Sequence, residues 1–243
     1  MEIYIVSITA FFASTLTLFS GFGLGTLLMP VVAVFFPVEV AIAVTAMVHL
    51  ANNLFKVVLL GKAADRSVLL RFGIPAVAAA FIGALVLGWL SDAPSLLEYT
   101  AFGRVHQISL LKLVVGTLIL TFVGLELMPW FSAIALDRKY LPFGGVISGF
   151  FGGLSGHQGA FRSMFLLKAG LNKEAFVATG VMVAVMVDIS RMLIYGRDMA
   201  GRTSVEWPLV IAASACAFIG AYSGKKLLRK VTIRESRSWY PYC

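Results

Sequence analysis

The segment that decides the fold is IYIVSITAFFASTLTLFSGFGLGTLLMPVVAVFF, residues 3–36, which contains no charged residue. An α-helix needs roughly 20 apolar residues to cross a bilayer, and this segment is nearly twice that length. Its middle reads Ser20-Gly21-Phe22-Gly23-Leu24-Gly25. Because glycine costs about 1 kcal/mol relative to alanine inside a helix, we expect a membrane segment that is broken at these glycines.

The whole chain has the composition of a membrane protein. Of its 243 residues, 59% are hydrophobic and 13% are charged, and the mean hydropathy is +0.90. The charged share is about half that of a soluble domain, too small to cover a water-exposed surface. The net charge of +8 is typical of the basic cytoplasmic loops of a membrane protein, and we expect no nucleic-acid partner.

Seven apolar segments with short polar links predict an all-α, polytopic membrane helix bundle. They cover about residues 3–36, 39–60, 72–91, 109–130, 141–169, 174–195 and 206–227. The fifth is broken, like the first, at Gly152-Gly153-Leu154-Ser155-Gly156-His157-Gln158-Gly159. A lysine- and arginine-rich stretch follows the last segment, so we expect a cytoplasmic C-terminal tail on a multi-pass protein of the cell membrane.

The two halves of the chain resemble each other. A shift of 135 positions superimposes Ser20-Gly21 on Ser155-Gly156, Glu39 on Glu174, Ala43 on Ala178, Asn53 on Asp188, Lys56 on Arg191 and Gly61 on Gly196. We therefore predict a first repeat at 1–108, a linking helix and loop at 109–140, a second repeat at 141–227 and a basic tail at 228–243. Such repeats are typical of secondary transporters.

The relative direction of the two repeats depends on the breaks. If each broken segment crosses the membrane once, the repeats are parallel; if each turns back as a re-entrant hairpin, they are inverted. The positive-inside rule favours inverted repeats. They would place on the inside Lys62, Arg66, Arg71, Arg138, Lys139 and Lys173, and on the outside Glu2, Glu39, Asp92 and Glu98, with Arg104 as the exception.

The glycine breaks are the first candidate site. Non-helical backbone at membrane depth is tolerated where it lines a cavity or is buried in protein, and the half-helix after each break would direct N–H groups and partial positive charge at an anion. The candidate backbone comprises Gly21, Gly23, Gly25, Ser155, Gly156 and Gly159. The alternative is that these glycines serve close helix packing.

Polar residues inside the apolar segments supply the candidate side chains. Ionisable groups at membrane depth are costly and usually functional, and here the balance is cationic, which suits a small oxyanion. The candidates are Thr45, His49, Asn52, Asn53, Lys56, His157, Gln158, Arg162, Asp188 and Arg191. Alternatively, Lys56 and Arg191 lie near helix ends and snorkel to the headgroups. Asp188 and Arg191 could also form a purely structural ion pair. Either His49 or His157 could carry a proton during transport, or could instead be held by a structural hydrogen bond between helices.

One motif is also compatible with an enzyme. Gly153-Leu154-Ser155-Gly156 is a GxSG string, and with His49 and Asn53 it is similar to intramembrane serine proteases of the rhomboid type. A serine nucleophile needs a base within hydrogen-bond reach, but no histidine follows His157, which we expect to be poorly placed two residues from Ser155. No P-loop, zinc spacing or dinucleotide fingerprint is present, so neither a cofactor nor a metal is expected.

The order of these motifs resembles one family over nearly the whole chain. Ser20-Gly21-Phe22-Gly23-Leu24-Gly25 with Pro30, Thr45, Asn52-Asn53 and Lys56 is similar to the first half of the TauE/SafE sulfite exporters. The stretch from Ser148 to Gly159, Arg162 and Phe176-Val177-Ala178-Thr179 is similar to the second half. The resemblance implies a transporter of sulfite or related organic anions and adds Thr179 to the candidate site. The counterpart of the fourth segment is missing after the second repeat.

The sequence thus predicts a secondary exporter of a small anion, such as sulfite or an organosulfonate, that works by alternating access. Export is implied by the resemblance alone. The alternatives are a membrane scaffold or subunit that transports nothing, and a passive anion channel. The expected partners are the anion, the lipid bilayer and a proton, and the sequence does not predict an oligomeric state.

Overall fold

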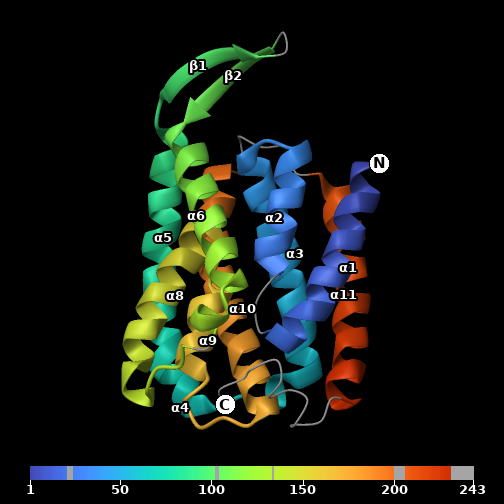
Figure 1. The fold of residues 1–243 in the computed structure, drawn as a ribbon, viewed down its shortest axis with the longest axis vertical. Helices are drawn as coiled ribbons and strands as arrows, with labels where there is room; N and C mark the ends of the chain where they lie inside the picture. Colours follow the sequence, from blue (N-terminus) through green and yellow to red (C-terminus); the bar gives the residue numbers. More distant parts are fainter. Residues whose placement is uncertain (21–23, 102–103, 133, 200–205, 231–243) are drawn as a thin grey trace.

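A computed structural model describes residues 1–20, 24–101, 104–132, 134–199 and 206–230. Long helices stand side by side in a bundle, and one hairpin projects from its end (Figure 1). The elements are α1 (Glu2–Ser20), α2 (Leu24–Phe35), α3 (Val38–Leu60), η1 (Gly61–Ala63), α4 (Arg66–Val68), η2 (Leu69–Gly73), α5 (Ile74–Asp92), β1 (Ser95–Ala101), β2 (Arg104–Ser109), α6 (Leu110–Leu127), α7 (Pro129–Ser132), η3 (Arg138–Tyr140), α8 (Leu141–Ser155), α9 (Gly159–Leu166), α10 (Lys173–Met199) and α11 (Trp207–Lys230).

The prediction of a membrane helix bundle is confirmed. Four helical spans in the described residues are long and apolar enough to cross a bilayer: Val38–Ala63, Arg66–Asp92, Lys173–Gly196 and Trp207–Leu227. Shorter apolar helices cover Glu2–Leu18, Leu24–Phe35 and Leu110–Leu125. Both predicted broken segments are helix pairs, α1 with α2 and α8 with α9.

The prediction of an all-α chain is wrong between α5 and α6. Strands β1 and β2 form an antiparallel hairpin there, with Glu98 opposite Gln107, Tyr99 opposite His106 and Thr100 opposite Val105. The hairpin extends beyond the helix ends (Figure 1). The reason lies in the sequence SLLEYTA of β1, in which Leu97 and Tyr99 alternate with polar residues and Tyr and Thr favour strands.

The helices form two bodies that share a seam. The first body consists of α1, α2, α3 and α11, whose buried residues include Val6, Leu28, Val44 and Ala213 in one apolar cluster. The second body consists of α5, α8, α9 and α10, which share another cluster with η2. The first body lies on the right in Figure 1 and the second on the left. Each body thus combines helices from both halves of the chain.

Close helix packing explains several glycines. Within the second body, a Cβ added at Gly149 would lie 2.1 Å from the Ala76 carbonyl oxygen, and one at Gly153 would lie 2.1 Å from that of Ala80. Within the first body, a Cβ at Gly220 would lie 2.3 Å from the Phe11 carbonyl oxygen. Gly152 and Gly153, predicted to belong to the break, lie within α8, so for Gly153 the packing interpretation is correct.

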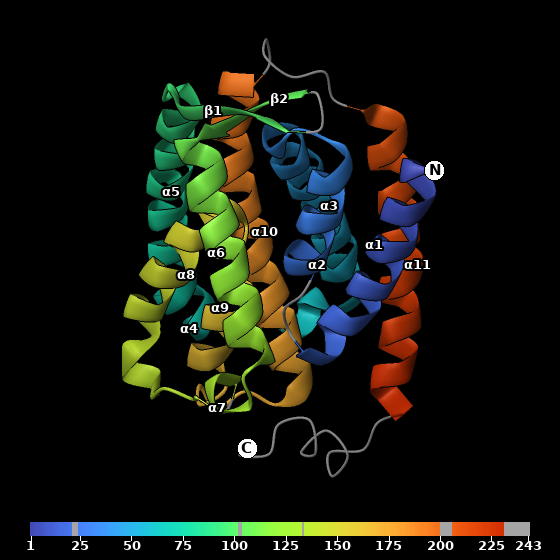
Figure 2. The same cartoon turned by 45° about the horizontal axis from the view of Figure 1, so that its top comes forward.

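Helix directions follow from these contacts. Ile42 and Ala46, near the start of α3, cluster with Tyr195, near the end of α10. At the other end of the seam, Val57 packs with Val177 and Val181, near the start of α10. Helices α3 and α10 are therefore antiparallel, and α1 and α8 also run in opposite directions (Figures 1 and 2).

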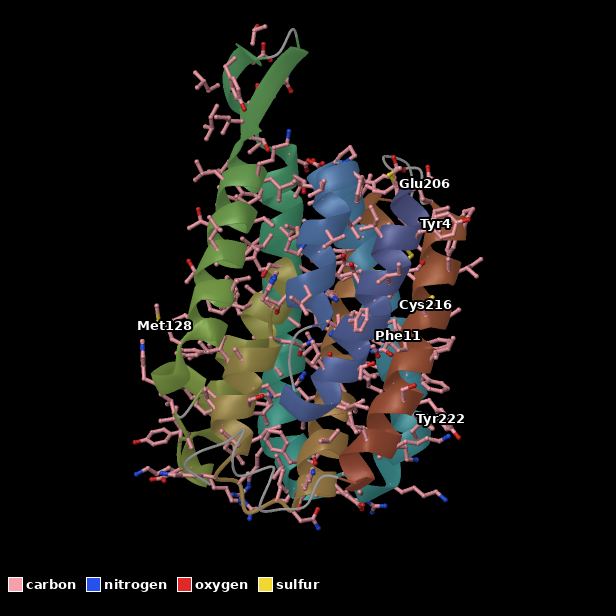
Figure 3. All side chains as sticks on the ribbon, turned by 45° about the vertical axis from the view of Figure 1, so that its right-hand side comes forward. Tyr4, Phe11, Met128, Glu206, Cys216 and Tyr222 are labelled. Carbon is pink, nitrogen blue, oxygen red and sulfur yellow. The ribbon has the colours of Figure 1, made fainter. Side chains whose placement is uncertain are left out.

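The two ends of the bundle differ in charge. At the end opposite the hairpin, Arg138 Nη2 donates to Ser67 Oγ (3.2 Å) and Lys225 Nζ to the Leu59 carbonyl oxygen (2.9 Å). The elements at that end carry three acids, Asp65, Asp137 and Glu174, and a larger number of basic residues: Lys62, Arg66, Arg71, Arg138, Lys139, Lys168, Lys173, Lys225 and Lys226. Tyr4 and Glu206 lie at the hairpin end, whereas Tyr222 lies towards the basic end (Figure 3).

Candidate functional site

The break between α8 and α9 is formed by Gly156, His157 and Gln158. Helix α8 ends at Ser155 and is capped by Gly156, whose φ of 81° is left-handed, a conformation that favours glycine. A Cβ at Gly156 would also lie 2.6 Å from Nη1 of Arg191. The start of α2 approaches this break closely, because a Cβ at Gly25 would lie 3.3 Å from the Gly156 carbonyl oxygen. The two broken segments therefore meet on the seam.

A cavity lies where they meet. Helices α1, α2, α3, α9 and α10 contribute to its wall together with the 156–158 break, and no acidic residue is among the described lining residues. Lys56 and Arg162 bring positive charge to it. The lining consists of Thr17, Leu18, Gly25, Thr26, His49, Asn53, Lys56, Gly156, His157, Gln158, Gly159, Arg162, Ser163, Leu166, Phe176, Val177, Gly180 and Val181.

A buried ionic network joins α3 to α10 behind this wall. Asp188 is fully buried, and its Oδ2 lies 2.6 Å from Nδ1 of His49 and accepts a hydrogen bond from Asn53 Nδ2 at 3.1 Å. Its Oδ1 lies 2.9 Å from Nη2 of Arg191, at an angle outside hydrogen-bond geometry, so this contact is an attraction between charges. A carboxylate at this depth needs such partners.

The Arg191 side chain contacts the 156–158 break and does not line the cavity. It is 2% exposed, is not part of the lining and contacts Gly156. One turn further along α10, Tyr195 Oη donates a hydrogen bond to the Gly153 carbonyl oxygen at 2.5 Å. Both α10 side chains thus reach the carbonyl end of α8, where a cation is favoured. The snorkelling alternative is excluded for Arg191.

Lys56 is also fully buried, and this excludes snorkelling for it as well. When the Asn52 amide is oriented to suit its neighbours, its nitrogen donates to the Ala217 carbonyl oxygen (3.2 Å) and its oxygen accepts from Lys56 Nζ (3.1 Å). Ser14 of α1 also lies within hydrogen-bond distance of this amide. Asn52 therefore positions Lys56 against the cavity without lining it.

The 156–158 break contains buried polar atoms that have no hydrogen-bond partner among the described residues. Gln158 is 1% exposed, and neither atom of its side-chain amide has a hydrogen-bond partner among the described residues. The same holds for Nε2 of His157, whose ring stacks on Phe122 at 5.5 Å between centroids. Buried polar groups are normally hydrogen-bonded, so unengaged ones in a cavity wall are typical of a binding site.

The structure brings together most of the predicted site residues. Gly25, His49, Asn53, Lys56, Gly156, His157, Gln158, Gly159 and Arg162 line the cavity, whereas Asn52, Asp188 and Arg191 support it from behind. Thr45 is buried outside the lining, and Thr179 Oγ1 accepts from the Asp65 N–H (2.9 Å), which ties α10 to the basic end. Gly21 and Gly23 lie outside the described residues.

Sequence reasoning missed Ser14, Thr17, Thr26, Ser163 and Tyr195. Tyr195 had a usable signal, since it lies on the same helical face as Asp188 and Arg191. The serines and threonines had none, because a hydroxyl in a membrane helix commonly bonds to its own backbone. Thr17 does this, donating to the Ala13 carbonyl oxygen at 2.6 Å.

The Ser155 environment differs from the predicted one. Nδ1 of His157 lies 3.1 Å from Ser155 Oγ, so the expectation that this histidine is poorly placed is wrong. However, the Ser155 hydroxyl donates to the Phe151 carbonyl oxygen (3.2 Å), and Asp188 engages His49 rather than His157. A nucleophile needs a base that is itself oriented by a third group, and the described residues offer His157 no carboxylate.

Apolar spans around a buried cationic cavity are typical of a multi-pass membrane transporter. The chain belongs to the sulfite exporter TauE/SafE family, whose family model matches residues 6–238. Members of this family are transporters, so the protein is not an enzyme. No curated protein and no solved structure matches the chain significantly.

Proposed function

We propose that this protein is a secondary transporter that exports sulfite or an organosulfonate through the cavity on the seam. The observation that carries the proposal is the cavity wall, in which Lys56, Arg162 and His49 stand with no described acid. A guanidinium offers two parallel N–H donors to an oxyanion, and an ammonium offers a point charge. Export and the sulfur-containing substrate come from the family.

The helix ends support the same class of ligand. Helix α9 begins at Gly159 and α2 at Leu24, and Gly25, Thr26 and Gly159 all line the cavity. The first N–H groups of a helix have no intrahelical partner, and they carry partial positive charge. We propose that both helix starts, with Asn53 and Gln158, orient the oxygen atoms of the anion, and that Asn52, Asp188 and Arg191 hold these groups in place.

Alternating access would open and close the seam. Towards the hairpin end, an apolar cluster that includes Met29, Ile42, Leu87 and Leu154 joins the two bodies. The cavity begins about two turns beyond Ile42 on α3, at His49, Asn53 and Lys56. Movement of one body against the other would break this apolar contact and expose the cavity at the hairpin end.

We propose that the chain contains two inverted repeats, 1–108 and 141–227, linked by 109–140 and followed by a basic tail at 228–243. Three observations support this. The helices of the second repeat follow the order of the first, α3 and α10 are antiparallel, and the packing of α1 on α11 corresponds to that of α8 on α5. Re-entrant breaks are therefore preferred to breaks that cross the membrane.

The distribution of charge supports a cytoplasmic location for the basic end and for the tail, in the cell membrane. In a Cys216→Ser/Cys243→Ser background, we expect a cysteine at position 206 to react with an impermeant maleimide on intact cells. A cysteine at position 64, between η1 and α4, should react only after permeabilisation. Labelling of both positions from the same side would contradict the inverted arrangement.

Transport itself is tested with purified protein in liposomes. We expect external sulfite to enter faster than in protein-free liposomes, and preloaded unlabelled sulfite to accelerate the uptake of labelled sulfite. This acceleration requires a carrier that alternates between two sides, so a passive channel would not show it. A membrane scaffold would move no sulfite or organosulfonate, and that result would contradict the proposal.

A further inference from the structure

His49 lies between the cavity and a buried acid. Its ring forms part of the cavity wall, and its Nδ1 lies 2.6 Å from the Asp188 carboxylate behind that wall. A neutral ring that donates from Nδ1 to a carboxylate keeps its lone pair on Nε2. The imidazole therefore connects the cavity to a fully buried acid.

The charged and titratable groups around His49 come from several elements. Its own helix carries Lys56, α10 carries Asp188 and Arg191, α9 carries Arg162, and the 156–158 break carries His157. The described lining residues of α1 and α2 are Thr17, Leu18, Gly25 and Thr26, which do not titrate. Asp188 is thus the acid among these groups, and it contacts both His49 and Arg191.

The His49 ring lies between Asp188 on one side and the cavity, with Lys56 and Arg162 in its wall, on the other. An anion bound in the cavity would bring a negative charge next to this ring, and a negative charge attracts a proton. Binding of the anion and protonation of His49 would then favour each other to the same degree, because linkage is reciprocal.

We propose that His49, held by Asp188, binds a proton together with the anion and that the two cross the membrane together. This rests on the proposed transport of sulfite or an organosulfonate. A sulfite dianion with one proton still carries negative charge, so an inside-negative membrane potential would drive its export. The proton comes from the solution to which the cavity is open and binds Nε2 of His49, while Nδ1–H stays on Asp188 Oδ2. No covalent bond to the substrate forms, and the proton leaves when the anion leaves.

The experiment uses His49→Gln, which keeps a side chain of similar length but cannot titrate. The full chain is reconstituted in liposomes, and two quantities are measured: sulfite accumulation under an inward-directed proton gradient, and sulfite exchange with the same pH on both sides. The readout is the ratio of the first to the second. We expect the gradient to raise this ratio in the wild type and to leave it unchanged in His49→Gln, even if exchange is slowed. Subtraction of protein-free liposomes corrects for passive entry of the protonated species.

Two variants control for the nature of the substitution. His106→Gln makes the same change on β2 of the hairpin and should behave as the wild type in both measurements. His157→Gln tests the rival histidine of the cavity, and we expect it to retain the response to the gradient. A response lost in His157→Gln and kept in His49→Gln would overturn the proposal.

A second readout does not require transport. Sulfite added to weakly buffered, detergent-solubilised protein should cause the wild type to take up about one proton per bound anion more than His49→Gln does. The acid–base equilibrium of sulfite itself contributes equally to both. Equal proton uptake by both proteins would overturn the proposal. Exchange without any gradient effect in the wild type would overturn it too, whereas absent exchange would count against the transport function itself.

Discussion

Replacement of Lys56 by methionine is expected to reduce the initial rate of sulfite transport roughly 10- to 100-fold at sub-saturating sulfite, and Arg162→Ala is expected to do the same. Hydrogen bonds to a charged group contribute about 1.5–3 kcal/mol, and about 1.4 kcal/mol is a tenfold change in affinity. Both cations line the cavity and are buried. The double variant should fall to the rate of protein-free liposomes.

The control for charge removal is Lys112→Met, the same substitution at an exposed lysine near the start of α6. It should leave the transport rate unchanged. Methionine at position 56 fills much of the volume of the lysine stem, so the variant should elute as a monodisperse species in detergent. If both Lys56→Met and Arg162→Ala transport at the wild-type rate, the anion does not bind in this cavity.

Gly149→Ala is expected to destabilise the protein by about 2 kcal/mol or more, which is the usual cost of overpacking a well-packed core. The new Cβ would lie 2.1 Å from the Ala76 carbonyl oxygen. Because that atom belongs to a helix backbone, α5 and α8 must separate to admit the methyl group. Thermal unfolding in detergent, followed by loss of the monodisperse peak, measures the effect.

Gly116→Ala is the matched control, since an added Cβ there meets no atom within 4 Å. Alanine exceeds glycine in helix propensity by about 1 kcal/mol, so this variant should be as stable as the wild type or slightly more so. The two substitutions are chemically identical and are expected to have opposite signs. Equal stability of both variants would show that α5 and α8 are not in close contact.

Much of the fold could be predicted because charge-free length is a strong signal in a membrane protein. Residues 39–60 and 206–227 were predicted as spans, and α3 and α11 occupy nearly these ranges. The hairpin at 95–109 was missed because it lies outside the bundle, where hydropathy indicates only a polar link. Its alternation of Leu97 and Tyr99 with polar residues was the signal available.

For the candidate site, the sequence identified the charged residues but not the role of each one. Lys56 and Asp188 could be identified because isolated charges are rare at membrane depth. Sequence could not distinguish Lys56, which lines the cavity, from Arg191, which contacts Gly156 behind it. That difference depends on which way α3 and α10 face, and only the packing of the helices determines it. For the same reason Gly153 and Gly156 looked alike, although one packs against α5 and the other ends α8.

The composition of the two bodies has a consequence for how such a chain could arise. Each body holds the first three helices of one proposed repeat and the last helix of the other, α11 in the first and α5 in the second. If the two repeats arose by duplication, an ancestor with a single repeat would have needed a second copy to form these two bodies. It would have existed as an antiparallel pair of identical chains that exchanged their last helices, as in domain swapping. Fusion of two such genes would have made an exchange between molecules permanent within one molecule.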